Sequence, residues 1–287
     1  MLFHQVAREL AGAGCPKLAH VTEPRRIPRV LAIAGSDSGG GAGIQADLKA
    51  LAACGVHGMT AVTAITAQNT VEVTAIHSVP PETIIAQVRA VAADIGVDAI
   101  KIGMLGTDAT IMAVARALDE LPAGTPVVLD PVMVAESGAE LLEPSARRAL
   151  IEQLLPRASV VTPNLPEARL LSGVGEASPE ELAKDVHALG PAAVVVTGGH
   201  ADDATDTFFD GARLVEIGGA RVPSGASHGS GCTHSSALAA GLAWGLDPLE
   251  AARRAKSLAA RAVEHGLRQI GSGAGPVDAL GLAGRLP

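Results

Sequence analysis

Short runs of Val, Ile and Ala alternate with helical stretches along most of the chain, and this alternation limits the fold more than any other feature of the sequence. The clearest runs are Val30–Ala34, Ala99–Met104, Val127–Leu129 and Val194–Val196. They are nearly continuous in apolar residues, and helical patterns of about 10 to 15 residues separate them. The alternation predicts an α/β fold with three α/β/α layers, in which helices cover both faces of a mostly parallel central sheet.

Further predicted elements fill the chain between these runs, and no repeat or low-complexity linker divides it. We therefore expect a single domain over residues 29–287. Residues 1–28 precede the first strand and are interpreted as a disordered N-terminal extension or as the product of a misplaced start codon. The other predicted strands are Thr60–Thr66, Val73–Val79, Val160-Val161 and a hairpin of Asp206–Phe209 with Leu214–Ile217. The predicted helices are Ile44–Cys54, Glu82–Ile95, Asp108–Glu120, Pro144–Leu155, Leu165–Leu171, Pro179–Leu189, Cys232–Trp244 and Pro248–His265.

Charge and cysteine content exclude several classes of partner. The chain carries 22 Lys and Arg against 30 Asp and Glu, a net charge of −8, so a nucleic-acid partner is not expected. Its three cysteines form no C-x-x-C pair, which fits a reducing cytoplasm. No apolar run reaches the ~18 residues that a membrane span needs. We therefore expect a cytoplasmic protein that acts on small molecules.

Aromatic side chains are nearly absent, with three Phe, one Trp and no Tyr in 287 residues. The core must therefore be built from small aliphatic side chains. A flat ligand would have to be held with little or no ring stacking.

Chemistry is expected at the carboxyl ends of the predicted strands, where ligands of open α/β sheets bind. Gly41, Gly43 and Ala46 fit the dinucleotide pattern G-x-G-x-x-A, but no acidic residue follows about 20 positions later to hold a ribose. The chain has no Gly-Lys pair, which a P-loop requires. Ser227 lies in a G-x-S-x-G pattern typical of α/β-hydrolases. Because Pro223 and Ser224 precede it where a strand is needed, the hydrolase interpretation is weaker.

The stretch Gly229-Ser230-Gly231-Cys232 directly precedes an Ala-rich helix. Glycines let backbone amides converge, and a helix start adds free N–H groups and the positive end of the helix dipole, so the stretch predicts an anion site. A glycine-rich turn that only caps the helix is the alternative. Cys232 falls in the first turn, where the pKa of a thiol can be lowered. It is interpreted either as a base or as a small buried residue.

Seven motifs spread over about residues 29–280 resemble, in their order, those of a kinase family. The chain is similar to the hydroxymethylpyrimidine/phosphomethylpyrimidine kinases of thiamine biosynthesis, which belong to the ribokinase-like superfamily. The resemblance implies a ribokinase-like fold with a small β-hairpin or flap. The motifs are Ala34–Asp37 with Gly41–Lys49, Ala67–Thr70, Lys101–Leu105, Asp130–Met133, Thr162–Ala168, Gly198–His200 and His228–Thr233.

The implied activity is two successive ATP-dependent phosphorylations, first of 4-amino-5-hydroxymethyl-2-methylpyrimidine and then of its monophosphate. The family pattern gives Cys232 the role of candidate base beside the substrate hydroxymethyl group. The backbone amides of Gly229, Ser230, Gly231 and Cys232 would neutralise the transferring phosphoryl group, since phosphoryl transfer depends mainly on positioning and charge stabilisation. The resemblance also implies a homodimer.

Further residues match positions that hold ATP and Mg²⁺ in the family. Asn164 and Glu167 match a pair that organises Mg²⁺ and its waters, and Asp130 is a second carboxylate near the metal. The spacing of Asn164 and Glu167 also fits a capping box, which is the purely structural alternative. The residues expected at ATP are Asn164, Glu167, Thr197 and Gly199.

The pyrimidine is expected to meet a mixed polar and apolar pocket. A Gln side chain offers a donor and an acceptor in one plane, which suits an aminopyrimidine edge. The alternative to a role in binding is that Gln68 only ends a strand and that Asp47 only faces solvent on its helix. Ser137-Gly138 are expected in a flap that excludes water. The residues expected at the pyrimidine are Gln68, Asp47, Gly35, Met104 and Val132.

Thr197 departs from the commonest family pattern, in which Lys often precedes the Gly-Gly pair. A lysine contact from this position to ATP phosphate is therefore absent. Two alternatives to the pyrimidine kinase remain: a pyridoxal or pyridoxine kinase of the same superfamily, and a ligand-binding relative that has lost phosphoryl transfer. The joint presence of Cys232, Asn164 and Glu167 argues against the second alternative.

Overall fold

The structure is a computed structural model and describes residues 26–198, 204–219, 222 and 226–284. Most of the predicted N-terminal extension and Gly199 lie outside these residues. The order of strands and helices confirms the prediction from sequence. The strands are β1 (Arg29–Asp37), β2 (His57–Gln68), β3 (Val73–Ser78), β4 (Ala99–Ile102), β5 (Val127–Leu129), β6 (Val160–Val161), β7 (Val194–Val196), β8 (Asp206–Phe209) and β9 (Leu214–Ile217). The helices are α2 (Gly43–Ala53), α3 (Pro81–Asp94), α4 (Asp108–Leu118), α5 (Ala146–Ala149), α6 (Leu165–Ser172), α7 (Pro179–His187), α8 (Ser230–Ala243) and α9 (Pro248–Glu264).

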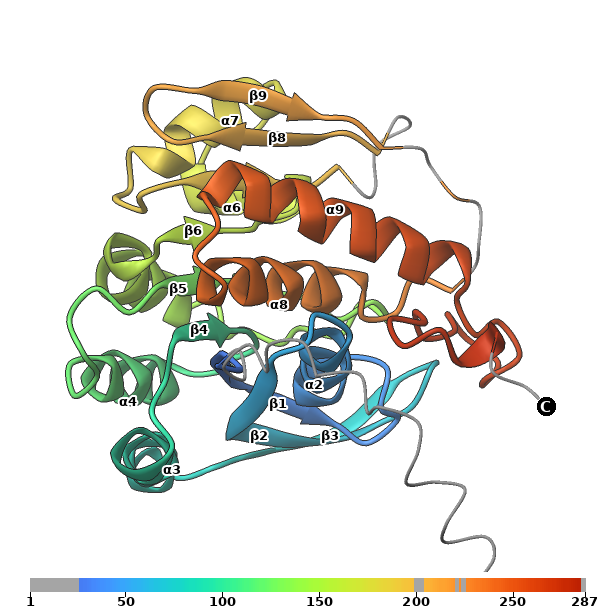
Figure 1. Cartoon of the computed structure of the whole chain (residues 1–287), viewed down its shortest axis with the longest axis horizontal. Helices are drawn as coiled ribbons and strands as arrows, with labels where there is room; N and C mark the ends of the chain where they lie inside the picture. The colour runs from blue at the N-terminus through green and yellow to red at the C-terminus, as the bar shows by residue number, and fades with distance from the viewer. Residues whose placement is uncertain (1–25, 199–203, 220–221, 223–225, 285–287) are drawn as a thin grey trace, which may run out of the picture.

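One mostly parallel sheet runs through the described residues, in the order β3-β2-β1-β4-β5-β6-β7-β8-β9 (Figure 1). The neighbours from β2 to β7 pair in parallel. The strands β3, β8 and β9 add antiparallel edges. The predicted hairpin of β8 and β9 forms and extends the main sheet, because β8 pairs with β7. The parallel centre places six strand ends at one edge of the sheet.

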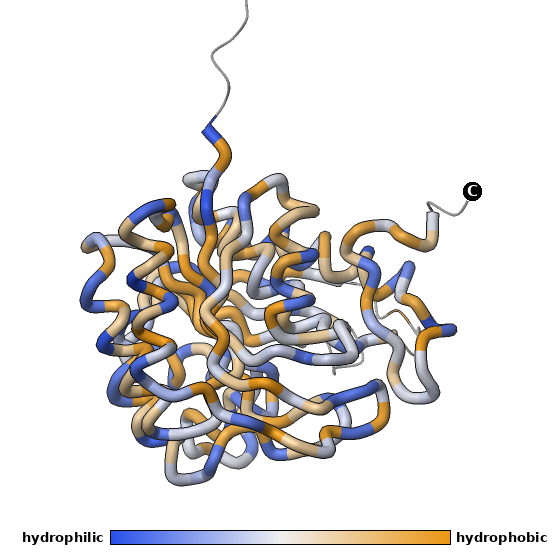
Figure 2. The backbone as a smooth tube through the Cα atoms, turned by 90° about the horizontal axis from the view of Figure 1, so that it is seen from below, coloured by the Kyte–Doolittle hydropathy of each residue, from blue (hydrophilic) through white to orange (hydrophobic). Residues whose placement is uncertain are grey.

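Helices cover both faces of the sheet, which confirms the three layers. Because side chains alternate along a strand, Leu31 and Ile33 of β1 join the core under α3 and α4, while Val30 joins the core under α8 and α9. Figure 1 shows α8, α9 and α2 together on the second face. The tube in Figure 2 carries hydrophobic colour along the strands inside the molecule and more hydrophilic colour on the outer turns.

Small side chains allow α8 and α9 to pack closely. Gly241 of α8 faces Ala251 of α9, and a Cβ at Gly241 would lie 2.9 Å from the Ala251 Cβ. Phe208 is fully buried in the same core. The core is otherwise aliphatic, as the scarcity of aromatic residues predicts.

The predicted helix Pro144–Leu155 is irregular. It begins as α5, continues as a π-helical turn over Leu150–Leu154 and ends in a 3-10 turn over Leu155–Arg157. Pro156 explains the irregular end, since proline has no N–H to donate and disfavours helical backbone at the residue before it. In the described part of the chain, no helix is long and apolar enough to cross a membrane.

Candidate active site

A cleft of about 1010 Å³ opens at the carboxyl ends of the parallel strands, where the sequence places the chemistry. It runs from Gln68 at the end of β2 to Thr197 beyond β7 and is closed on one side by the start of α8. Of the predicted site residues, the cleft is lined by Gly35, Gln68, Met104, Asp130, Val132, Asn164, Glu167, Thr197, Gly229, Ser230, Gly231 and Cys232.

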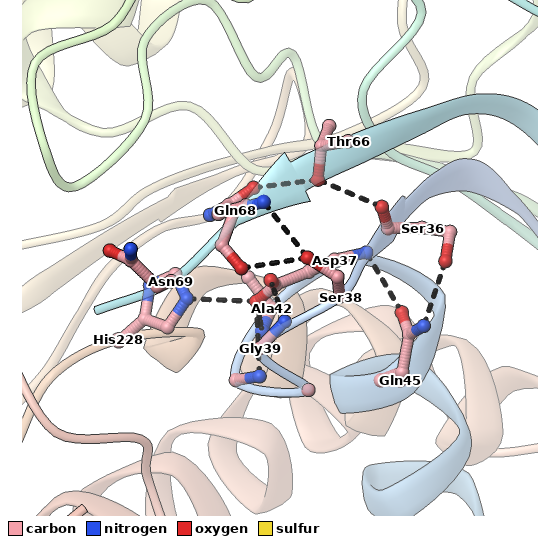
Figure 3. A network of polar contacts seen from close by, with 12 residues as sticks. Ser36, Asp37, Ser38, Gly39, Ala42, Gln45, Thr66, Gln68, Asn69 and His228 are labelled. Atoms are coloured by element: carbon pink, nitrogen blue, oxygen red, sulfur yellow. Dashed lines mark hydrogen bonds and ion pairs between the residues drawn. The ribbon is translucent and has the colours of Figure 1, made fainter. Parts of the chain in front are cut away.

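Asp37 fixes the glycine-rich loop that follows β1 (Figure 3). Its carboxylate accepts hydrogen bonds from the backbone amides of Gly39, Gly41 and Ala42, at 2.8 to 3.0 Å. The other partner is His228, whose Nε2 lies 2.9 Å from Asp37 Oδ2. Burial opposes ionisation of Asp37, but these bonds together hold its pKa below the ordinary value. Asp37 thus joins the loop after β1 to the loop before α8.

The predicted anion loop enters α8 without a side-chain cap. Gly229 is the N-cap residue, with a left-handed φ of 83°, and no capping side chain bonds to it among the described residues. The N–H of Ser230 donates to the carbonyl oxygen of Ser227 at 3.0 Å. Among the described residues, the N–H groups of Gly231 and Cys232 are therefore the ones in the first turn that stay available for a ligand.

Gly229 also touches the first loop, since a Cβ there would lie 1.9 Å from the carbonyl oxygen of Gly41. His228 exchanges backbone hydrogen bonds with Gly275 and Val277, so the loop is held from both sides.

Cys232 lies in the first turn of α8 and lines the cleft. Burial raises the pKa of its thiol to about 12, although the positive charge of Lys101 and the amide of Gly43 act in the opposite direction. The expected lowering by the helix start is therefore wrong for the free protein, because desolvation outweighs the helix end. Burial therefore favours the protonated thiol in the free protein.

Asp47 corrects the prediction for the pyrimidine site. Its side chain is fully buried, does not line the cleft, and accepts hydrogen bonds from Lys101 Nζ at 2.7 Å and from Ser236 Oγ at 2.8 Å. It is therefore neither a solvent-facing residue nor a cleft residue. Lys101 Nζ lies also 4.0 Å from Asp130 Oδ2. Burial opposes the charge of Lys101, but its carboxylate neighbours raise its pKa above the ordinary value. The buried pair of Asp47 and Lys101 lies behind the cleft lining and contacts it through Asp130.

One end of the cleft combines a single amide side chain with apolar walls. Gln68 Oε1 accepts a hydrogen bond from Thr66 Oγ1 at 3.1 Å (Figure 3), which fixes the carboxamide of Gln68 at the strand end. Met104, Val132 and nearby aliphatic residues form a small apolar cluster. Gly35 makes room for this cluster, because a Cβ there would lie 2.9 Å from the Met104 sulfur.

The predicted flap is a short hairpin over residues 133–141. Ala135 N donates to Ala139 O, and Leu141 N donates to Met133 O, each at 2.8 Å. Glu136 of the flap accepts a hydrogen bond from Ser227 Oγ at 2.8 Å. The flap therefore contacts the anion loop across the mouth of the cleft, and both Glu136 and Ser227 line it.

Asn164 and Glu167 confirm the structural interpretation of their spacing, while their role at Mg²⁺ stays a prediction. They form a complete capping box at the start of α6, with bonds of 2.9 and 3.0 Å, and both line the cleft. Burial and the nearby charge of Asp130 raise the pKa of Glu167 to about 8. Burial also raises the pKa of Asp130, which accepts a hydrogen bond from Ser235 Oγ. Two buried carboxylates with raised pKa values are the environment that a cation would relieve.

The far end of the cleft is apolar and lacks aromatic rings among its described residues. It is formed by small aliphatic residues of α9 and of the segments near β8 and β9. Thr197 pairs with Asn164 in an isolated parallel bridge. The next residue, Gly198, donates its amide to the buried Asp206, which also accepts from Lys256. The apolar residues are Ala204, Val222, Ala259, Ala260 and Val263.

Four polar residues with a clear place in the site were not singled out from sequence: Asp37, Lys101, His228 and Lys256. Lys101 had a signal, because it is a charged residue inside the apolar strand Ala99–Ile102. Lys256 had one as well, since it lies in the Ala-rich face of α9. Asp37 and His228 lie in two of the motifs that resemble the family, but nothing in the sequence indicated their contact, because it joins residues 191 positions apart.

Comparison with known proteins places these features in context. A family model described as phosphomethylpyrimidine kinase matches residues 37–278. A hydroxymethylpyrimidine/phosphomethylpyrimidine kinase from Rhizobium meliloti is 51% identical over 254 residues, covering 86% of this chain and 95% of the relative. The thiamine biosynthesis bifunctional protein ThiED from Geobacter sulfurreducens is 48% identical over 264 residues, which are 88% of this chain and 53% of that protein.

Solved structures share the fold. The pyridoxal kinase from Bacillus subtilis in an ADP complex has a TM-score of 0.81 and 39% identity, and the match covers 90% of this chain and 99% of that one.

Proposed function

The chain belongs to the phosphomethylpyrimidine kinase family, and from that premise we propose that it phosphorylates 4-amino-5-hydroxymethyl-2-methylpyrimidine with ATP, and then the monophosphate, in thiamine biosynthesis. The observation that carries this proposal is the continuity of the cleft. It joins a polar and apolar end at Gln68 and Met104, an uncapped helix start at Gly229, and an apolar end at Ala259. The first part suits a pyrimidine, the helix start suits a transferring phosphoryl group, and the apolar end suits an adenine.

In the proposed reaction, the hydroxymethyl oxygen attacks the γ-phosphorus of ATP and ADP leaves. The amides from Gly229 to Cys232 stabilise the charge on the transferring group. Gln68 orients the pyrimidine through its amide hydrogens. Cys232 is proposed to accept the hydroxyl proton once the bound substrates have changed the environment of its thiol. Asp47 acts indirectly, by holding Lys101 under the site.

We also propose that Mg²⁺ acts with ATP. Asp130 and Glu167 would hold it, mainly through water, because Mg²⁺ keeps several waters of hydration. The raised pKa values of both carboxylates support this assignment. When bound, the ion would neutralise charge on the phosphates. Among the described residues no cluster of three metal-ligating side chains exists, which suits an ion held largely by nucleotide and water.

The activity is tested by incubating the purified protein with ATP, Mg²⁺ and either the pyrimidine alcohol or pyridoxal. We expect two products from the pyrimidine alcohol, the monophosphate followed by the diphosphate. Pyridoxal is the competing substrate because pyridoxal kinases share this fold. Turnover of pyridoxal far above that of the pyrimidine alcohol would contradict the proposal.

Cys232→Ala tests the proton acceptor. We expect kcat to fall by about 10² to 10⁴, the usual contribution of a positioned base, while the affinity for the pyrimidine is kept. The matched variant Gln68→Ala should show the opposite pattern, with weaker pyrimidine binding. An unchanged kcat in Cys232→Ala would remove the thiol from this role, and an unchanged Kd in Gln68→Ala would remove Gln68 from the substrate contacts.

Organisation and surroundings complete the proposal. We propose that residues 29–287 act as one kinase domain, supported by the single sheet of the described residues. A cytoplasmic location is in keeping with ATP as a substrate.

A homodimer is supported by the edge hairpin of β2 and β3, where Ile65, Val71 and Ile76 are 53%, 53% and 45% exposed.

A further inference from the structure

The proposed reaction needs two distant parts of the chain to be held at a fixed separation. The acceptor alcohol is expected near Gln68 at the end of β2, whereas the transferring phosphoryl group is expected at the start of α8. Transfer is fast only when the attacking oxygen and the phosphorus are held about 3 to 3.5 Å apart. A residue that links the two parts would therefore control the rate.

The loop after β1 is tied to the end of β2 through Ser38 (Figure 3). Ser38 Oγ donates to the carbonyl oxygen of Gln68 at 2.7 Å, and the backbone amide of Gln68 donates to Ser38 Oγ at 2.8 Å. The neighbouring residue, Asp37, accepts hydrogen bonds from three amides of the same loop. The loop and the end of β2 therefore hold each other in place.

His228 joins this loop to the anion loop. It directly precedes Gly229, and its ring packs against Gly41, where a Cβ would lie 2.2 Å from His228 Cδ2. Its side chain is 8% exposed, and its Nε2 lies 2.9 Å from Asp37 Oδ2. The bonds around Asp37 hold the pKa of its carboxyl below the ordinary value. Because an ionised carboxylate can only accept, Nε2 carries the hydrogen and donates it to Asp37.

The backbone of His228 is fixed as well, so the imidazole projects from an anchored point. His228 N donates to the carbonyl oxygen of Gly275, and Val277 N donates to that of His228, each at 3.1 Å. The two loops also meet where the amide of Gly43 donates toward the Cys232 thiol. A shift of one loop against the other would therefore move both the phosphate-binding amides and the proposed base.

We propose that His228 is a positioning residue for phosphoryl transfer, which sets the separation between the acceptor alcohol at Gln68 and the phosphoryl group at the anion loop through its bond to Asp37. The inference rests on the proposed kinase function. In this role His228 acts through the two loops and not through a contact of its own with either substrate. Its loss should therefore slow the transfer while each substrate still binds.

The test compares His228→Phe with the wild type. Phenylalanine keeps a ring against Gly41 but removes the donor to Asp37. We expect kcat for the pyrimidine alcohol to fall about 10²-fold, the cost that a misplacement of about 1 Å can have. The Kd values of the alcohol alone and of ATP alone, measured by calorimetric titration, should change by less than about threefold, because neither ligand loses a contact. His57→Phe, at the exposed start of β2, is the matched control and should leave all three quantities unchanged.

A pair of amide variants separates positioning from folding. In His228→Gln the side-chain N–H₂ group can donate from nearly the place of Nε2, whereas the side chain in His228→Asn is one methylene shorter and does not reach Asp37. The glutamine variant should therefore have a kcat about tenfold above that of the asparagine variant. The double variant His228→Phe/Asp37→Asn should have a kcat within about threefold of the lower single variant, because both changes break the same link.

An unchanged kcat in His228→Phe, or a loss that appears only as weaker binding of one substrate, would overturn the inference. Equal kcat values in the glutamine and asparagine variants at equal melting temperatures would overturn it as well. A wild-type protein that phosphorylates pyridoxal in place of the pyrimidine alcohol would contradict the proposed function alone, because the same variants can then be compared with pyridoxal as the acceptor.

Discussion

At the scale of single residues, Gly229 shows how strictly the phosphate site depends on backbone geometry. Its left-handed backbone disfavours any side chain, and the carbonyl oxygen of Gly41 occupies the space that a Cβ would need. The two glycine loops can therefore meet only if both lack side chains at the contact. This contact aligns the start of α8 with the loop after β1.

Gly229→Ala should lower kcat by about 10²-fold or more, because the amides of the anion loop would be displaced from the transferring group. Gly245→Ala is the matched control: Gly245 has a similar φ of 80°, but a Cβ added there would meet no neighbouring atom of the described residues within 4 Å. The control should lose only about 1 to 2 kcal/mol of stability and keep its activity. Steady-state kinetics and thermal unfolding of both variants check this; equal activities would contradict it.

Glu167 makes stability depend on pH. Its pKa is about 8 in the folded protein and near 4.5 when unfolded, so its contribution to stability is complete below pH 4.5 and is lost as pH rises toward 8. The melting temperature of the wild type should therefore fall relative to that of Glu167→Gln between pH 5 and about 8. Glu181→Gln, in the exposed capping box of α7, is the control and should run parallel to the wild type. Parallel curves for Glu167→Gln would refute the assignment.

Residue environments were the least predictable part of the site. Cys232 at a helix start suggested a lowered thiol pKa, but burial reverses the sign. Asp47 lies on a helix whose sequence does not reveal which face is covered, and only the tertiary contact with Lys101 shows that it is buried. By contrast, the spacing of Asn164 and Glu167 predicted the capping box, because local geometry determines it, while their place in the cleft was expected from the strand end before them and from the resemblance.

At the scale of elements, the flap and the segment just before the anion loop together form one boundary of the cleft. The flap hairpin is short, and its tip at Ser137-Gly138 is exposed. Its contact with Ser227 comes from one side chain, Glu136. A change at Glu136 is therefore expected to affect the segment that leads into the proposed anion loop.

Glu136→Ala should raise the KM for the pyrimidine about fivefold, as expected for the loss of one hydrogen bond. It should also increase the share of ATP that is hydrolysed by water, since a looser flap excludes water less well. Glu140→Ala, which removes the other flap carboxylate, is the control. The ratio of ADP formed to pyrimidine phosphorylated measures the effect, and equal ratios in the two variants would contradict it.

Elements themselves were predicted well, because buried parallel strands are apolar throughout and proline or glycine marks their boundaries. β5, β6 and β7 have the predicted bounds. β1 and β2 extend further than their apolar runs, since their polar ends at Asp37 and Gln68 still pair across the sheet. The π-helical turn at Leu150–Leu154 has no local signature in the sequence except the nearby Pro156.

At the scale of the whole molecule, the two edges of the sheet differ in character. The edge formed by β2, β3 and the turn between them exposes three large apolar residues, Ile65, Val71 and Ile76, whereas β9 at the other edge exposes one, Leu214. Exposed apolar edge strands tend to be covered by partners. The first edge is thus the face proposed for the homodimer.

Ile76→Asp should convert the proposed dimer to a monomer, because a buried interface does not tolerate an unpaired charge. Leu214→Asp places the same charge on the opposite edge and should leave the dimer intact. Light scattering coupled to size exclusion gives the mass of each variant. A dimer that survives Ile76→Asp would rule out this edge.

The arrangement of α8 has a spectroscopic consequence. The chain holds a single Trp and no Tyr, so Trp244 dominates its ultraviolet fluorescence. Trp244 ends the helix whose first turn forms the anion loop, and its indole N–H donates to the carbonyl of Cys54 at the end of α2, whose first residue is Gly43. The molecule therefore carries a built-in emission probe at the remote ends of the two helices whose first residues line the cleft.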